Sequence, residues 1–194
     1  MTAGLILAAG ESQRMGSPKA LLLYQGETFL DRLIGLFSRY CSPVIAVLGA
    51  ERECIRAALR RAGEAQIVDN PDYRLGQITS MQGGLRVVPA DAKAVLFTLV
   101  DHPAVRLETI AALLAPGAPA WLRIPRRAGR RGHPILFSQA LIPEFLVLPY
   151  TSSARDVLVR RSSDIEYLDV DDPGILADID DPDAYRRLLT GESA

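Results

Sequence analysis

The sequence LILAAGESQRMGSPKALL, residues 5–22, contains the transition that decides the fold. Residues 4–9 are apolar without polar alternation, which is typical of a strand buried on both faces of a parallel sheet. The run stops at Gly10, and small residues with two cations, Arg14 and Lys19, follow it. Such a segment can bring backbone N–H groups and positive charge to a phosphate, or it can be a solvated turn. Neither GxxxxGK[ST] nor GxGxxG is present, so the residues alone leave the two alternatives equal.

Strand-like and helix-like segments alternate along the rest of the chain. Periodicity predicts strands at residues 4–9, 43–48, 65–68, 93–100, 120–124, 135–137 and 165–170. It predicts helices at residues 27–40, 51–62, 80–88, 107–114 and 182–189, and a basic loop at 125–134. The short connections favour one α/β domain over residues 1–194, with a mostly parallel sheet and helices on both faces. Ligands bind at the carboxyl ends of strands in such sheets, which selects residues 8–19, 70–80 and 101–103.

The composition excludes several classes of protein. With 194 residues, 48% hydrophobic and 23% charged, the chain has the makeup of a globular domain. A formal net charge of −1 argues against a general nucleic-acid-binding protein. Cys41 and Cys54 are too few and too far apart for a metal cluster or a disulfide framework. There is no positively charged leader and no apolar run of membrane-spanning length, so we expect a cytoplasmic protein that does not enter membranes.

An acidic residue ends the strongest predicted strand, in the sequence VDHP at residues 100–103. Asp101 therefore stands where a metal-bridged phosphate would lie, since Mg²⁺ prefers carboxylate and phosphate oxygens. The alternative is that Asp101 caps the following helix, and the two interpretations carry equal weight. We interpret His102 as an incidental neighbour rather than a base.

Two further charged segments lie in the second half of the chain. In ADIDDPDAY, residues 177–185, an extended backbone would point Asp178 and Asp180 to the same face, so either could complete a metal site with Asp101. A solvated acidic turn is the commoner explanation, and Asp181 before a proline is typical of a helix N-cap. The arginine-rich segment at residues 123–134 could receive an anionic substrate, although a solvated loop is favoured.

The usual nucleophiles and bases are missing from the sequence. There is no GxSxG segment and no Cys/His spacing that suits zinc. This absence fits a reaction whose nucleophile is already ionised, such as a substrate phosphate with a second pKa of about 6. Catalysis would then consist of positioning and charge neutralisation.

Several blocks together resemble one enzyme family. LAAGESQRMGSPK, residues 7–19, matches every fixed position of the signature LAAGxSxRMGxPK of the MobA-like nucleotidyltransferases. NPDYRLGQITSMQGGL, residues 70–85, resembles the NPxxxxGxxxSxxxGL block of that family, and VDHP, GHPILF and DIDDPDAY resemble its later segments in the same order. The resemblance implies a three-layer, Rossmann-like fold of the nucleotide-diphospho-sugar transferase type.

Within the family the chain looks most like the enzymes that transfer CMP from CTP to the phosphate of Mo-molybdopterin with Mg²⁺ as cofactor. The similarity to cytidylyltransferases rests on Ala9, because the cytidylyltransferases have LAAG where the guanylyltransferases have LAGG. The resemblance implies a nucleotide site of Leu7, Ala8, Ala9, Gly10, Arg14, Lys19, Asn70, Gly76 and Ser80. It implies catalytic roles for Lys19, Arg14 and Asp101, and metal ligation by Asp101 and Asp180. Implied partners are CTP, a phosphorylated pterin acceptor, and a molybdoenzyme or its accessory chaperone.

One departure from the family pattern keeps alternatives open. Family members often have DxGAR where residues 149–158 of this chain read PYTSSARDVL, so a contact to the acceptor could differ. The alternatives are a CTP- or GTP-dependent transferase for another small phosphorylated acceptor, and a non-catalytic nucleotide-binding protein that delivers a cofactor.

Overall fold

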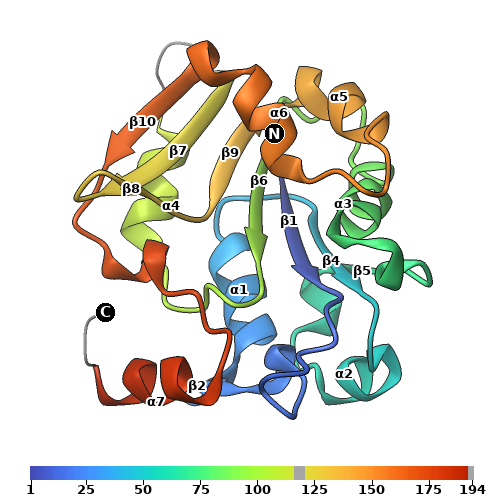
Figure 1. Cartoon of the computed structure of the whole chain (residues 1–194), viewed down its shortest axis with the longest axis vertical. Helices are drawn as coiled ribbons and strands as arrows, with labels where there is room; N and C mark the ends of the chain where they lie inside the picture. The colour runs from blue at the N-terminus through green and yellow to red at the C-terminus, as the bar shows by residue number, and fades with distance from the viewer. Residues whose placement is uncertain (116–120, 192–194) are drawn as a thin grey trace.

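The computed structural model describes residues 1–115 and 121–191, whose main sheet has eight strands. The order across the sheet is β10-β7-β9-β6-β1-β4-β5, with β8 paired to β7 (Figure 1). The strands are β1 (Thr2–Ala8), β4 (Val44–Leu48), β5 (Gln66–Asp69), β6 (Ala94–Leu99), β7 (Leu122–Arg127), β8 (Arg130–Arg131), β9 (Ile135–Ser138) and β10 (Ile165–Asp169). A separate two-stranded ribbon pairs β2 (Leu23–Tyr24) with β3 (Glu27–Thr28).

Most neighbouring strands run parallel, as predicted. β1 pairs in parallel with β4 and β6, β4 with β5, and β10 with β7. β9 is the exception among the long strands, because it runs antiparallel to both β6 and β7. Consequently β6 and β7 point the same way, and their carboxyl ends meet at the edge of the sheet where β1 also ends.

Helices cover both faces of this sheet. One face packs against α1 (Phe29–Phe37), α2 (Arg52–Ala58), α4 (Leu107–Leu114) and α7 (Pro182–Thr190). The other packs against α3 (Gln77–Leu85), α5 (Ile142–Leu146) and α6 (Ala154–Arg160). The continuous apolar run of β1 is explained by this arrangement: Ile6 faces the first set of helices and Leu5 faces the second, and both are fully buried.

The arginine-rich segment differs from the prediction. Residues 125–134 were expected to form a loop, but β7 continues to Arg127 and turns through Ala128 and Gly129 into β8. Both turn residues have positive φ, 48° and 78°, as a tight hairpin requires. Arg126 is held in the strand by an ion pair with Asp169 of β10 at 2.7 Å.

The remaining predicted elements are confirmed with shifted ends. The third helix begins at Gln77 rather than residue 80, and the predicted second helix ends at Ala58. The short helices α5 and α6 were not predicted. The predicted strand start at residue 120 lies outside the described residues. No helix in the described part of the chain has the length and apolarity needed to cross a membrane.

Candidate active site

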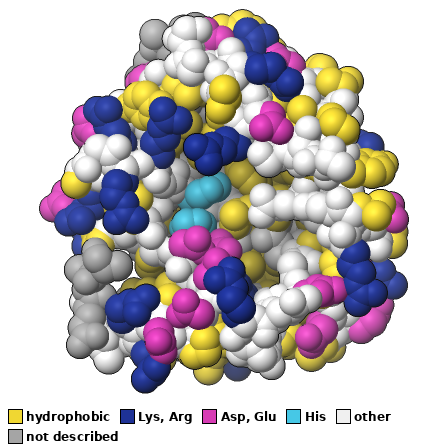
Figure 2. Space-filling model, in the orientation of Figure 1, with side chains coloured by type: hydrophobic (Ala, Val, Ile, Leu, Met, Phe, Trp, Pro, Cys, Tyr) yellow, Lys and Arg dark blue, Asp and Glu magenta, His cyan; other side chains and the backbone are white. Residues whose placement is uncertain are grey.

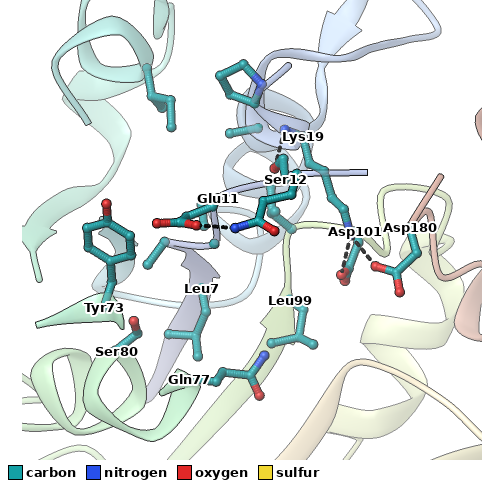
Figure 3. Close-up of a pocket in the computed structure, with 18 of the residues that line it drawn as sticks. Leu7, Glu11, Ser12, Lys19, Tyr73, Gln77, Ser80, Leu99, Asp101 and Asp180 are labelled. Carbon is teal, nitrogen blue, oxygen red and sulfur yellow. Dashed lines mark hydrogen bonds and ion pairs between the residues drawn. The ribbon is translucent and has the colours of Figure 1, made fainter. Parts of the chain in front are cut away.

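A cavity of about 620 Å³ opens at the carboxyl ends of β1 and β6 (Figure 3). This volume lies within the range of sites for small molecules, roughly 300–1,000 Å³. Most of the predicted site residues line it: Leu7, Ala8, Ala9, Gly10, Arg14, Lys19, Ser80, Asp101 and Asp180. The structure therefore brings together residues from the first strand, from α3, from the end of β6 and from the segment before α7.

The loop after β1 is shaped by its backbone and by one hydroxyl. Ser12 has a positive φ of 50°, and its Oγ accepts a hydrogen bond from the Lys19 backbone N–H at 3.0 Å. Behind the loop, a Cβ on Gly49 would lie 2.7 Å from the Ala9 carbonyl oxygen. Only glycine fits there without displacing the wall of the cavity, so Gly49 supports the position of Ala9.

Lys19 lies between two carboxylates. Its Nζ donates to Asp101 Oδ2 at 3.2 Å and also to Asp180 Oδ1, and its side chain is only 12% exposed. Burial lowers the pKa of Lys19, but the hydrogen bond to Asp180 and the nearby negative charges outweigh it, so the pKa is raised overall. The Lys19 hydrogen bond likewise lowers the pKa of Asp180. Lys19 is therefore a fixed positive charge at the inner end of the cavity.

Arg14 supplies a second cation at the rim. Its Nη2 lies 2.8 Å from Asp180 Oδ2, and its side chain is 70% exposed. Asp180 thus contacts both predicted phosphate-binding cations. Arg14 faces solvent and Lys19 does not, which predicts a large difference in the strength of their electrostatic effects.

Three side chains next to Lys19 form a compact group of possible metal ligands. Asp101, His102 and Asp178 each offer one ligand atom, and these atoms lie within 4.8 Å of one another. Asp101 Oδ1 is buried and accepts no hydrogen bond within the described structure. An unsatisfied buried carboxylate oxygen beside a second carboxylate suits a divalent cation. Asp180 as a metal ligand stays a prediction.

Asp101 does not cap the following helix. The N-cap position of α4 is Arg106, and the carboxylate that accepts the Arg106 backbone N–H, at 2.9 Å, is that of Asp172. The capping interpretation of Asp101 is therefore wrong, and its carboxylate is available to the cavity.

His102 was interpreted as an incidental neighbour, but it belongs to this group. It is buried and stacks on His133, with ring centroids 4.6 Å apart. Burial, with the charge of Lys19, lowers the pKa of His102 to about 4. Burial and the neighbouring His102 lower the pKa of His133 to about 3, so both rings are neutral near pH 7. The only sequence signal for His102 was its place next to Asp101.

Two predicted nucleotide-site residues do not line the cavity. Asn70 is buried behind it, where its amide donates to the hydroxyls of Thr79 and Ser80, both at 2.8 Å. Gly76 has a φ of +129°, and a Cβ there would lie 2.8 Å from the Tyr150 carbonyl oxygen. Both residues position the start of α3, so that Ser80 faces the cavity.

Other lining residues were not named individually from the sequence. Glu11, Tyr73, Arg74, Gln77 and Leu99 border the cavity as well. Arg74 Nε lies 2.7 Å from Glu11 Oε1, an ion pair that joins the loop after β1 to the segment before α3. Except for Leu99, they fall within residues 8–19 or 70–80, which the sheet-edge rule had selected.

Comparisons with known proteins identify the family. The profile of the MobA-like NTP transferase domain matches residues 4–165. The chain belongs to the MobA-like NTP transferase family. It is therefore a nucleotidyltransferase.

Individual relatives and solved structures show which members of the family the chain resembles. The molybdenum cofactor cytidylyltransferase of Escherichia coli (strain K12) is 29% identical over 184 residues, which cover 93% of this chain and 92% of that protein. A molybdenum cofactor guanylyltransferase of Sinorhizobium fredii is 33% identical over 103 residues, 51% of this chain and 45% of that protein. The crystal structure of Rv0371c from Mycobacterium tuberculosis has a TM-score of 0.83 at 27% identity and covers 97% of both chains. A structure of Rv0371c in complex with manganese has a TM-score of 0.80, with 97% of this chain and 98% of that chain covered.

Proposed function

We propose that the chain transfers CMP from CTP to the phosphate of Mo-molybdopterin and releases pyrophosphate, with Mg²⁺ as cofactor. The observation that carries this proposal is Lys19, a buried cation held beside Asp101 at the end of a cavity walled by Ala8, Ala9 and Gly10. The similarity to the Escherichia coli cytidylyltransferase over nearly the whole chain supports the acceptor and the nucleotide.

In the proposed reaction an oxygen of the acceptor phosphate attacks the α-phosphorus of CTP. The bond between the α-phosphorus and the bridging α–β oxygen breaks, and pyrophosphate leaves with the electron pair. The attacking phosphate is already ionised, so the chain needs no base to activate it. Lys19 stabilises negative charge that develops on the α-phosphate, and Arg14 binds outer oxygens of the triphosphate.

Asp101 and Asp178 would hold the cation, together with or in place of Asp180, the second ligand that the family resemblance implies. A divalent cation at these carboxylates would supply neutralisation of the phosphate charges. The side chains of Asp101 and Asp178 fit this role because their oxygens converge and Asp101 Oδ1 accepts no hydrogen bond from any described residue.

We infer the preference for CTP from Ala9. Ala9 lines the cavity, and its carbonyl oxygen and Cβ lie next to Gly49, which leaves this segment of the wall little freedom to move. A methyl group at this position, where guanylyltransferases have glycine, narrows the cavity and favours the smaller pyrimidine base.

Pyrophosphate release with each of the four nucleoside triphosphates, with and without Mo-molybdopterin and Mg²⁺, tests the proposal. We expect release to require CTP, the acceptor and the metal together. Preference for GTP would overturn the assignment of the base. Turnover with another phosphorylated metabolite but not with molybdopterin would replace the acceptor. CTP binding without any turnover would favour the cofactor-delivery alternative.

A further inference from the structure

A second cavity, of about 230 Å³, lies between the β7–β8 hairpin, the turn before the acidic segment, and α7. Four arginines line it: Arg106, Arg127, Arg130 and Arg187. We call this cavity the arginine pocket. It contains residues of the segment that was predicted to be either a solvated loop or a receiver of an anionic substrate, and the hairpin fold of that segment gives the second interpretation a defined place.

The charges in the arginine pocket do not cancel. Of its two carboxylates, Asp172 is buried and accepts hydrogen bonds from the Arg106 backbone N–H, the Thr109 hydroxyl and the Gly174 N–H. Its Oδ1 also lies 3.9 Å from Arg106 Nε, so Asp172 offsets the charge of that arginine. Arg127 pairs with Asp171 at 3.2 Å, but the Asp171 side chain is 95% exposed, and such pairs exchange readily with solvent.

The remaining two arginines have unused donors. Within the described residues, 1–115 and 121–191, Arg130 and Arg187 form no ion pair. Arg186, the neighbour of Arg187 on α7, is instead paired with Asp183 and does not line the pocket. Guanidinium groups with free N–H donors hold phosphate oxygens in a bidentate geometry, so the pocket suits a phosphate.

The arginine pocket adjoins the reaction centre. Asp178 lines it, and the Asp178 carboxylate also lies within 4.8 Å of the ligand atoms of Asp101 and His102. Asp101 of this group lines the larger cavity, so the group lies where the two cavities adjoin. Figure 2 shows this relation on one face: histidine and acidic side chains lie in the central hollow, and Lys and Arg side chains gather beside and above it.

We propose that the arginine pocket binds the phosphate group of the acceptor and presents it to the nucleotide held in the larger cavity. This inference rests on the proposed function, because it needs a phosphorylated acceptor. A volume of about 230 Å³ is below the usual size of a complete small-molecule site, so the pocket holds the phosphate end of the acceptor rather than the whole molecule.

The test uses two matched double variants of the full chain. Arg130→Ala/Arg187→Ala removes the two arginines with unused donors. Arg131→Ala/Arg186→Ala removes their sequence neighbours, which lie on the same strand and helix but do not line the pocket. All four side chains are exposed, and thermal melting checks that both variants fold like the wild type.

The first measurement is a ³¹P NMR titration with inorganic phosphate, with CTP saturating the nucleotide cavity and EDTA present. We expect the dissociation constant for phosphate to rise about tenfold or more in Arg130→Ala/Arg187→Ala and to stay within twofold of wild type in the control. Equal phosphate binding by the two double variants would overturn the proposal.

The second measurement is the KM for Mo-molybdopterin and for CTP in the pyrophosphate assay. We expect the pocket variant to raise the acceptor KM about tenfold or more while the CTP KM stays within twofold. Loss of phosphate binding with an unchanged acceptor KM would overturn the proposal, because the anion would then be unrelated to the acceptor. If the wild type releases no pyrophosphate with Mo-molybdopterin, the proposed function fails, whereas the phosphate titration still decides whether the pocket binds phosphate.

Discussion

Replacement of Lys19 by methionine should slow catalysis far more than the same change at Arg14. Lys19→Met removes the ammonium and keeps an unbranched side chain of similar length. The Lys19 side chain is 12% exposed, so its charge acts in a medium with an effective dielectric constant of about 20. Two unit charges about 4 Å apart then interact by about 4 kcal/mol, which corresponds to roughly a 10³-fold loss of rate. The Arg14 side chain is 70% exposed, and in a medium close to water the same interaction gives only about a fivefold loss.

Single-turnover pyrophosphate release at saturating CTP and acceptor measures this difference directly. Arg126→Ala serves as the control, because Arg126 pairs with Asp169 and does not line the nucleotide cavity. Thermal melting separates slow chemistry from unfolding. Rate losses for Lys19→Met and Arg14→Met that agree within threefold, or a Lys19→Met enzyme within tenfold of wild type, would refute the reasoning from burial.

Three other perturbations follow from the same geometry. Because burial lowers the pKa of His102 to about 4, the unfolded chain binds more protons than the folded one between pH 6.5 and 4, so stability falls as the pH falls through that window. In metal-free buffer, denaturant unfolding of the wild type should lose about 2 kcal/mol more than that of His102→Gln between pH 7 and 5; equal losses would contradict it. Gly49→Ala should destabilise by roughly 1–3 kcal/mol and weaken CTP binding measured by calorimetry, because the new Cβ displaces Ala9; wild-type affinity would count against it. Asn70→Ala should cost about 1–3 kcal/mol in chemical denaturation and raise the KM for CTP, since it leaves the Ser80 hydroxyl without its buried donor; an unchanged KM would show that Ser80 is not positioned this way.

The architecture was predictable where burial dictates the sequence pattern. The strands β1, β4 and β6 are buried on both faces, so their apolar runs could be recognised without knowledge of their neighbours. The direction of β9 could not be predicted, because an antiparallel strand in the interior of a sheet is as apolar as a parallel one. The helices α5 and α6 have five and seven residues, too few for a clear helical period.

The arginine-rich hairpin was missed for a different physical reason. Its charged residues are typical of a solvated loop, and the contacts that make them a strand come from β10. Arg126 pairs with Asp169 and stacks on Tyr167, and both partners are about forty residues away in the sequence. No local pattern contains that information.

The candidate site was likewise only partly predictable from the sequence. Residues of the loop after β1 could be named because small and cationic residues follow a buried strand, and the cavity contains them. The sequence offered Asp178 and Asp180 equally as partners of Asp101, and only the tertiary fold shows that the carboxylate of Asp178 lies in one group with Asp101 and His102. Asn70 and Gly76 stay predicted nucleotide-site residues, although neither lines the cavity and Asn70 is hydrogen-bonded to Thr79 of α3.

The antiparallel strand β9 lies between the part of the sheet that borders the larger cavity and the part that borders the arginine pocket, so the specificities of the two cavities could change separately in evolution. The nucleotide cavity is lined by residues up to Asp101 with Asp180 as its one later contributor, and the arginine pocket by residues from Ala104 onward with Tyr24 as its one earlier contributor. In the sheet, β9 lies between β6 and β7 and runs antiparallel to both. Each cavity is therefore built almost entirely from one half of the chain. If the two cavities bind the ligands proposed above, we expect that exchange of the later half between relatives would change which molecule receives the nucleotide and leave the choice of nucleotide in place.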